Sequence, residues 1–173
     1  MNTPKILGVF ILFIYKEYME IYIAGHKSGS LQYFLGKRPN EFDALIITDI
    51  KTSFPDDILP SLNDHLWLKF NDVNSQYETQ IHPTKEHIEQ GLNWAKGREK
   101  IVVACHAGIS RSSAMALLIA YQECQDIEQS FSVINIHHHS PNLLIIKIGC
   151  EIFGEPGLWN RFLQSNDEKL KSY

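Results

Sequence analysis

Cysteine is scarce in this chain, and a hydrophobic run long enough to cross a bilayer is missing. The three cysteines, at positions 105, 124 and 150, are odd in number and have the spacing of neither a zinc site nor a disulfide framework. Such usage is typical of a reducing compartment, so we expect a cytoplasmic protein. The apolar stretch 6–15 is much shorter than the roughly 20 residues that a membrane-spanning helix needs.

Positive charge is also sparse. Lys and Arg number 16 against 20 Asp and Glu, the net charge is −4, and no long Lys/Arg cluster occurs. This balance argues against nucleic acid or an anionic membrane surface as the main partner. Repeats, low-complexity tracts and long linkers are absent too, and 173 residues with 44% hydrophobic content suit one core. We therefore predict a single domain over 19–173.

The first eighteen residues stand apart because of the apolar stretch 6–15. Lys16 and Glu17 follow it at once, and the small-residue cleavage site of a secretory signal does not follow. Because 19–25 already has the pattern of a first strand, we expect 1–18 to be an extension ahead of the core. The alternatives are an export signal, or an extra strand or helix that packs on the core.

Strand-like and helix-like segments alternate from position 19 onward. Apolar or alternating runs predict strands at 19–25, 44–48, 65–70 and 101–104. Helices are expected at 28–37 (or a loop), 83–96, 112–123, 126–137, 142–153 and 156–169. Asp126 with Gln129 resembles a capping box at the start of one of them. The order predicts an α/β fold, with a mainly parallel sheet of four to five strands flanked by helices and a helical C-terminal third.

The most informative feature is a cysteine and an arginine separated by five residues, Cys105 and Arg111, between an apolar strand and a helix. A loop of this length can turn its backbone N–H groups inward around a tetrahedral oxyanion, and the helix that follows adds its positive end. Glycine at position 108 permits strained backbone angles, and Arg111 can bind two phosphate oxygens at once. The loop residues expected around a phosphate are His106, Ala107, Gly108, Ile109, Ser110 and Arg111.

Cys105 lies at the floor of this predicted loop. A thiol at a helix N-terminus beside an arginine ionises more readily than a free one, and the thiolate is the nucleophile. We predict that it attacks phosphorus and forms a phosphocysteine intermediate. Because Arg111 and the backbone amides hold the charge, we expect no metal ion and no other cofactor. The expected partner is a phosphorylated protein or a small phosphomonoester.

The leaving oxygen needs a proton as its bond to phosphorus breaks. Asp72 follows the strand 65–70 at the carboxyl edge of the sheet, where Cys105 also stands, so we predict it to be the general acid. Asp49 follows another strand at that edge and is the second candidate, whereas Asp64 precedes its strand. In the second step the same carboxylate would activate the water that hydrolyses the intermediate.

Several other polar residues have two readings. The hydroxyl of Ser112 can hydrogen-bond the cysteine sulfur and help it leave, or it can cap the helix; both roles stay open. Ser110 would brace the loop.

The three histidines 137–139 point in different directions in any regular backbone, so we interpret them as a helix end rather than a metal site. Cys124 and Cys150 are expected to be small apolar side chains of the core.

The run 103–113 resembles the active-site loop of the cysteine-dependent protein tyrosine phosphatases, most closely that of the dual-specificity branch. The wider pattern, 19–159, resembles small bacterial proteins predicted to be tyrosine phosphatases, and Pro141-Asn142 before an apolar helix is one of the matches. One departure is Ala104, because the family usually has histidine just before the cysteine.

The resemblance implies hydrolysis of phosphotyrosine, with phosphoserine and phosphothreonine as further possible substrates. It also implies a general acid on a loop upstream of the cysteine, an element that Asn71-Asp72-Val73 matches. His106 and the absence of lysine in the loop argue modestly against a highly charged inositol phosphate. Two other classes stay open: a catalytically silent phosphopeptide-binding module, and sulfur or arsenate chemistry as in rhodanese-like enzymes and small arsenate reductases.

Overall fold

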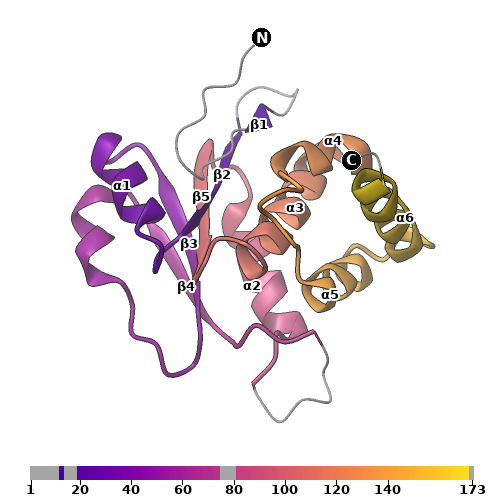
Figure 1. The fold of residues 1–173 in the computed structure, drawn as a ribbon, viewed down its shortest axis with the longest axis horizontal. Helices are drawn as coiled ribbons and strands as arrows, with labels where there is room; N and C mark the ends of the chain where they lie inside the picture. Colours follow the sequence, from indigo (N-terminus) through magenta and orange to yellow (C-terminus); the bar gives the residue numbers. More distant parts are fainter. Residues whose placement is uncertain (1–11, 14–18, 75–80, 172–173) are drawn as a thin grey trace.

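The structure, a computed structural model, describes residues 12–13, 19–74 and 81–171 (Figure 1). The strands are β1 (Leu12–Phe13), β2 (Glu20–Gly25), β3 (Asp43–Thr48), β4 (His65–Lys69) and β5 (Lys100–Cys105). The α-helices are α1 (Ser30–Lys37), α2 (Lys85–Ala95), α3 (Arg111–Cys124), α4 (Ile127–Ser130), α5 (Leu143–Phe153) and α6 (Leu158–Lys171). Two short 3-10 helices are η1 (Asp56–Ser61) and η2 (Phe131–Val133).

The strands form one sheet in the order β1-β2-β5-β3-β4. The four strands β2, β5, β3 and β4 are parallel, and β1 pairs with β2 in the antiparallel direction. The predicted α/β architecture, with a mainly parallel sheet and a helical C-terminal part, is confirmed. In the register of the central strands Cys105 lies opposite Gly25, so the carboxyl ends of β2 and β5 reach the same edge together.

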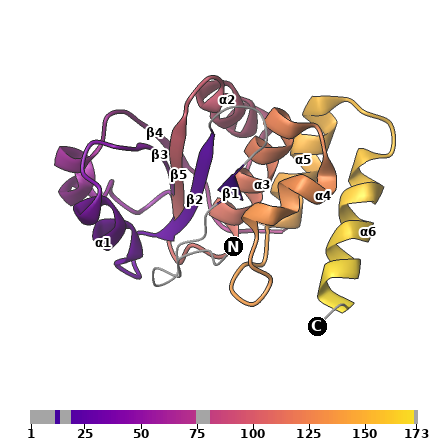
Figure 2. The same cartoon turned by 90° about the horizontal axis from the view of Figure 1, so that it is seen from above.

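Both faces of the sheet are covered, which is why its strands are apolar almost throughout. Successive strand side chains point to opposite faces. Ile21 and Ile23 belong to a large cluster with α2, α3, α5 and α6, whereas Tyr22 and Ala24 pack with Phe34 of α1 and its neighbours. Figure 2 shows α1 on one side of the sheet and helices α2 to α6 on the other.

Helix α3 occupies the middle of the larger layer. Every residue from Arg111 to Tyr121 is buried, so the helix has no solvent-facing side over most of its length. A helix that is apolar nearly all round is typical of a core position. Because α3 begins directly after the 105–110 loop, the core fixes both the loop and the first residue of the helix.

The prediction of a helix over 126–137 is wrong beyond its first turns. Asp126 does cap α4, since its carboxylate accepts a hydrogen bond from Gln129 N at 2.8 Å. The helical backbone ends after η2, and the side chain of Asn135 accepts a hydrogen bond from His137 N at 3.0 Å. An asparagine side chain that bonds nearby backbone competes with the helix. The histidines 137–139 therefore lie in and directly after the turn at 136–138, not at a helix end.

Part of the N-terminal stretch is described. Leu12 and Phe13 pair with Ile21 and Glu20 at the edge of the sheet. The rest of 1–18 lies outside the described residues, so the prediction of an extension, like that of a single domain over 19–173, stays a prediction. Within the described part of the chain, no helix combines the length and the apolar character needed to cross a membrane.

Candidate active site

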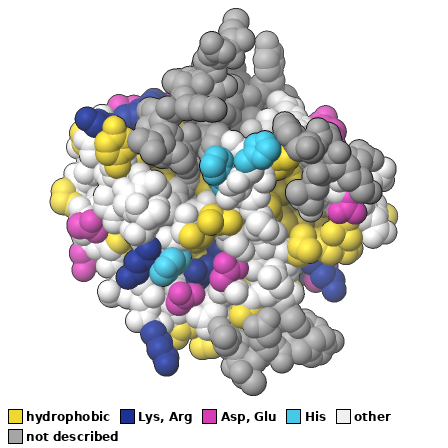
Figure 3. Space-filling model, in the orientation of Figure 1, with side chains coloured by type: hydrophobic (Ala, Val, Ile, Leu, Met, Phe, Trp, Pro, Cys, Tyr) yellow, Lys and Arg dark blue, Asp and Glu magenta, His cyan; other side chains and the backbone are white. Residues whose placement is uncertain are grey.

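A large open pocket lies above the loop that joins β5 to α3. Its volume is about 1000 Å³, and we call it the main pocket. Charged and histidine side chains gather near the middle of the face in Figure 3, and the main pocket has both carboxylates and cations in its wall. The pocket is lined by Asp49, Ile50, Lys51, Thr52, Asn71, Asp72, Ile81, Cys105, His106, Ala107, Ile109, Ser110 and Arg111. The structure thus brings both candidate acids together with the cysteine and the arginine.

The sulfur of Cys105 lies at the buried end of this pocket. The residue is only 2% exposed, and its Sγ is 3.1 Å from the hydroxyl oxygen of Ser112, which is itself fully buried. The helix N-cap position belongs to Ser110 instead, and no side chain caps it. Of the two roles left open for Ser112, the structure shows a contact with the sulfur. A hydroxyl there can donate a hydrogen bond to a thiolate.

The end of β2 supports the loop from behind. The N–H of His26 donates to the carbonyl of Cys105 at 2.9 Å, and the N–H of Lys27 donates to the carbonyl of His106 at 3.0 Å. His26 is buried, and its ring contacts the exposed His106 ring with centroids 5.7 Å apart. Burial, and then the neighbouring His106, lower the pKa of His26. The carbonyls of Cys105 and His106 are thus paired with the backbone that directly follows β2.

Two glycines make close contact at this junction. Gly108 has φ of +76°, a region that favours glycine, and a Cβ there would lie 2.6 Å from the carbonyl carbon of Ala24. A Cβ on Gly25 would lie 2.6 Å from the backbone of Ala107. The loop and the strand therefore fit together only when both positions lack a side chain.

The guanidinium of Arg111 is buried, and its hydrogen bonds to the protein are donated by one nitrogen, Nη1. The side chain is 3% exposed, and Nη1 donates to Asp49 Oδ1 at 2.8 Å and to the carbonyl of Phe70 at 2.8 Å. Its Nε is buried and has no hydrogen-bond partner among the described residues. Buried donors are nearly always paired, so an unpaired one beside a pocket indicates a place for a ligand. Asp49 acts here as a partner that orients Arg111.

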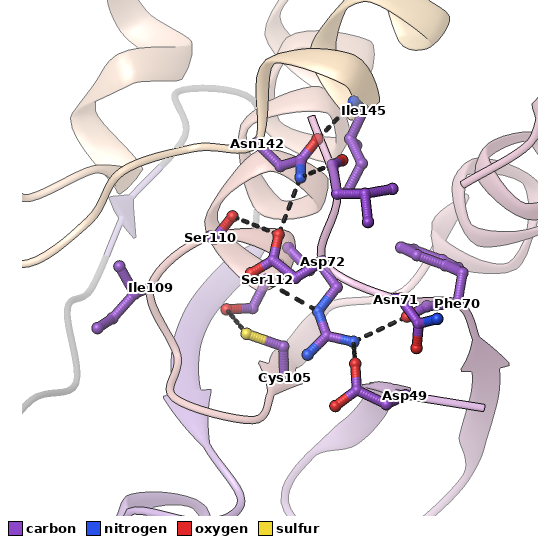
Figure 4. Close-up of polar contacts among 12 residues, drawn as sticks. Asp49, Phe70, Asn71, Asp72, Cys105, Ile109, Ser110, Ser112, Asn142 and Ile145 are labelled. Carbon is purple, nitrogen blue, oxygen red and sulfur yellow. Dashed lines mark hydrogen bonds and ion pairs between the residues drawn. The ribbon is translucent and has the colours of Figure 1, made fainter. Parts of the chain in front are cut away.

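Asp72 lies over the same pocket, held by one of its oxygens. Oδ1 accepts a hydrogen bond from Ser110 Oγ at 2.7 Å and another from Asn142 Nδ2 at 2.9 Å (Figure 4). The other oxygen, Oδ2, is 4.0 Å from Arg111 Nε. The carboxylate is thus anchored through Oδ1, and Oδ2 lies on the side of the guanidinium.

Asn142 is the residue that sequence reasoning missed. It is 1% exposed and serves as the N-cap of α5, where its Oδ1 accepts a hydrogen bond from Ile145 N at 3.1 Å. Its Nδ2 donates to Asp72 and also to the carbonyl of Val73 at 2.9 Å. The Pro-Asn pair before an apolar helix was a usable signal for a helix start. Nothing in the local sequence indicated the contact with a loop seventy positions earlier.

The remaining candidates lie elsewhere. Asp64 binds Arg98 at 2.6 Å, and this contact lowers the pKa of Asp64. Cys150 is buried, and burial raises its pKa to about 12; burial also raises the pKa of the half-buried Cys124. In the described part of the chain, no three His, Cys, Asp or Glu side chains come together as a possible metal site, the histidines 137–139 included.

No protein-family model matches the chain, and no curated protein matches it. Several solved structures, in contrast, are similar to the chain. The PTP-2 phosphatase of Cydia pomonella has a TM-score of 0.57 and 18% identity, with 80% of this chain and 87% of that chain covered. The human tyrosine phosphatase-like serine/threonine/tyrosine-interacting protein has a TM-score of 0.55 and 16% identity, with 78% and 91% covered. A mouse putative dual specificity phosphatase has a TM-score of 0.54 and 14% identity, with 85% and 86% covered.

These similarities define the class of fold. The chain has the fold of the cysteine-dependent protein tyrosine phosphatases, in its dual-specificity-like form. The resemblance predicted from the 103–113 loop is confirmed at the level of the fold.

Proposed function

We propose that this chain is a phosphomonoesterase that removes phosphate from phosphotyrosine, and also from phosphoserine or phosphothreonine, through a cysteinyl-phosphate intermediate. The observation that carries the proposal is the arrangement in the main pocket. A buried cysteine sulfur lies 3.1 Å from a buried hydroxyl, and a buried guanidinium with an unpaired Nε stands in the same pocket wall. This is the arrangement that binding and attack of a tetrahedral oxyanion require.

In the first step the phosphate dianion lies within the 105–111 loop, and Arg111 binds its oxygens through nitrogens other than Nη1. The thiolate of Cys105 attacks phosphorus, and the bond between phosphorus and the ester oxygen breaks. Asp72 gives its proton to that oxygen, so the product leaves as an alcohol or phenol. The phosphoryl group is now bonded to sulfur.

In the second step Asp72, now ionised, takes a proton from a water molecule. The water oxygen attacks phosphorus, the bond between phosphorus and sulfur breaks, and inorganic phosphate forms. The electron pair returns to the sulfur of Cys105, which becomes a thiolate again. The hydroxyl of Ser112, 3.1 Å away, stabilises that thiolate by donating a hydrogen bond.

The contacts of the two carboxylates favour Asp72 over Asp49 as the acid. Asp49 is ion-paired with Nη1 of Arg111 at 2.8 Å, so its role is to orient the guanidinium. Asp72 accepts from two neutral donors, Ser110 and Asn142, on a single oxygen. Its second oxygen is therefore available to carry a proton toward the substrate. No step requires a metal ion or another cofactor, because the arginine and the loop amides hold the charge.

The test is turnover of an aryl phosphate by three proteins: the native chain, Cys105→Ser and Asp72→Asn. We expect a burst of phenol from the native chain in single-turnover conditions, no burst from Cys105→Ser, and a reduced rate from Asp72→Asn. The reduction should be on the order of 10²-fold or more when the leaving phenol is weakly acidic. If Asp72→Asn is unchanged and Asp49→Asn is inactive, the assignment of the acid is wrong.

A phosphopeptide-binding module without catalysis is the second candidate function, and it is favoured by the name of one similar structure, a tyrosine phosphatase-like serine/threonine/tyrosine-interacting protein. The same burst experiment decides between the two functions. Binding of a phosphopeptide with no phenol release from any phosphate ester would favour the module. Turnover of thiosulfate or arsenate without phosphatase activity would instead favour the chemistry of rhodanese-like enzymes or arsenate reductases.

A further inference from the structure

A second hollow of about 440 Å³ lies beside the main pocket. Its wall consists of Ser28, Gly29, Ser30, Tyr33, Ala107, Gly108, Ile109, His138 and His139. Ala107 and Ile109 line both hollows, so the loop that would hold a phosphate is also the ridge between them. A ligand anchored in the main pocket and extended across Ile109 enters the second hollow directly.

Exposed hydrophobic side chains gather around these two hollows. Among the described residues, five large hydrophobic side chains are exposed: Tyr33, Leu59, Ile81, Ile109 and Leu143. Three of them line the hollows, with Tyr33 51% exposed, Ile81 51% and Ile109 44%. Apolar groups that cluster around a pocket, rather than scatter over a surface, indicate a binding site.

The polar groups of the second hollow are largely occupied within the protein. Ser28 Oγ donates to the carbonyl of Gly25 at 3.0 Å, and Ser30 Oγ accepts from the N–H of Gly25 at 2.9 Å. His139 Nδ1 accepts from Asn135 N at 3.0 Å, and burial lowers the pKa of His139 to about 4, so the imidazole is neutral. The ring of Tyr33 and the side chain of Ile109 are the apolar part of the wall.

The walls of the hollow are also fixed relative to each other. Ser140 N donates to the carbonyl of Ile109 at 3.1 Å, which ties the segment that carries His138 and His139 to the ridge. On the other side, Gly25 makes a close contact with Ala107 and donates its N–H to Ser30 Oγ at 2.9 Å, which ties the start of α1 to the same loop. A hollow with fixed walls needs little reorganisation when a ligand enters.

We propose that the second hollow binds an apolar or aromatic side chain of the phosphorylated substrate, two positions away from the phosphorylated residue. This inference rests on the proposed function for the main pocket and names its substrate as an extended segment of a protein. In an extended chain, residues two apart point to the same face, about 7 Å from each other. The phosphorylated side chain thus enters the main pocket, the backbone crosses Ile109, and the second side chain contacts Tyr33.

The experiment compares kcat/KM for p-nitrophenyl phosphate with kcat/KM for a set of phosphotyrosine peptides. Each peptide has alanine around the phosphotyrosine except for one leucine, placed at each of the three positions before and after it. The variants are Tyr33→Ala and Tyr33→Phe, with Leu59→Ala as the matched control, because Leu59 is 40% exposed and lines neither hollow. Binding of the same peptides to Cys105→Ser is measured in parallel.

We expect the native chain to prefer leucine two positions from the phosphotyrosine on one side. Tyr33→Ala should lower kcat/KM for that peptide roughly tenfold and remove the preference, as loss of an aromatic contact at an interface commonly does. Tyr33→Phe and Leu59→Ala should retain the preference, and p-nitrophenyl phosphate should be hydrolysed equally by all. Two results would overturn the inference. One is an equal kcat/KM of the native chain for every peptide, and the other is a Tyr33→Ala variant that loses kcat/KM equally for the peptides and for p-nitrophenyl phosphate.

The binding measurements separate this inference from the proposed function. If the native chain hydrolyses no phosphate ester but Cys105→Ser binds the peptides with the predicted preference, the phosphatase proposal fails and the second hollow stands. If esters are hydrolysed without any positional preference, the second hollow fails and the phosphatase proposal stands.

Discussion

Asn142 joins Asp72, the proposed general acid, to the helical C-terminal part, and two substitutions can separate the tasks of Asn142. Its Oδ1 caps α5 by accepting from Ile145 N, while its Nδ2 donates to Asp72 Oδ1 and to the carbonyl of Val73. Asn142→Ser keeps an oxygen that can cap the helix and removes the two Nδ2 bonds. Asn142→Ala removes the cap as well. The pair therefore distinguishes the position of the acid from the stability of the helix.

The magnitudes follow from burial. Of the two acceptors that lose Nδ2, Asp72 Oδ1 is exposed and keeps its hydrogen bond from Ser110, whereas the carbonyl of Val73 is buried and is left unsatisfied. An unsatisfied buried acceptor costs about 1–3 kcal/mol, and loss of an N-cap costs about 1 kcal/mol. We expect the free energy of unfolding to fall by about 1–3 kcal/mol in Asn142→Ser and by about 1 kcal/mol more in Asn142→Ala. A misplaced acid should lower the rate on the order of 10²-fold for a poor leaving group.

The assay uses two aryl phosphates. Phenol, like the side chain of tyrosine, has a pKa of about 10, so in the proposed mechanism it needs the proton from Asp72 when it leaves. The more acidic p-nitrophenol needs it less. We expect Asn142→Ser and Asn142→Ala to lose far more activity on phenyl phosphate than on p-nitrophenyl phosphate, and we expect the same pattern for Asp72→Asn. Denaturant titration of the same proteins gives the stability difference.

Two results would refute this reasoning. If the two substrates lose activity equally, in proportion to the lost stability, Asn142 only supports the fold. If neither substrate is affected although Nδ2 is gone, the bond to Asp72 does not position a group that takes part in the reaction.

Three further predictions concern other contacts of the site and its surroundings. Asp49→Asn should raise KM for p-nitrophenyl phosphate roughly tenfold without the leaving-group dependence seen for Asp72→Asn, because it weakens only the orientation of Arg111. Gly108→Ala should abolish turnover and cost about 1–3 kcal/mol of stability, since φ is +76° and the new Cβ meets backbone at 2.6 Å; normal turnover would contradict the close contact. His139 has a pKa of about 4 in the folded chain against 6.5 unfolded, so the folded state binds fewer protons and stability should fall by about 3 kcal/mol as pH drops from 6.5 to 4. His139→Asn, measured by denaturant titration across this range, should show a shallower fall.

The parts that could be predicted from the sequence are those encoded locally. Each expected strand begins and ends within one residue of the observed one, because three of them are short apolar runs buried on both faces and the fourth, at 65–70, alternates apolar and polar residues. The loop before α3 could also be predicted from the sequence, because its cysteine, glycine and arginine all lie within seven consecutive positions. The prediction of a helix over 126–137 was wrong because the side chain of Asn135 accepts a hydrogen bond from the backbone N–H of His137, and this bond competes with a helical backbone. Hydrophobic periodicity does not reveal such a competition.

What could not be predicted is which distant segments meet at the site. The order of the strands placed Asp49 and Asp72 at the correct edge, but it did not show that one binds Arg111 while the other is held by Asn142. The carbonyl of Phe70 that holds Arg111 is a backbone atom and has no sequence signature at all. Such contacts depend on tertiary packing, and neither the hydrophobic period nor the residue spacing of the sequence reveals them.

The tight fit between the end of β2 and the 105–111 loop has a consequence for the proposed reaction. Because Gly25 and Gly108 leave no space and two carbonyls are tied to His26 and Lys27, the cradle has its shape before any ester arrives. A rigid cradle discriminates little between an ester and the free anion released from it. For the proposed reaction we therefore expect inorganic phosphate, and mimics such as vanadate, to compete with substrate, so that turnover slows as phosphate accumulates.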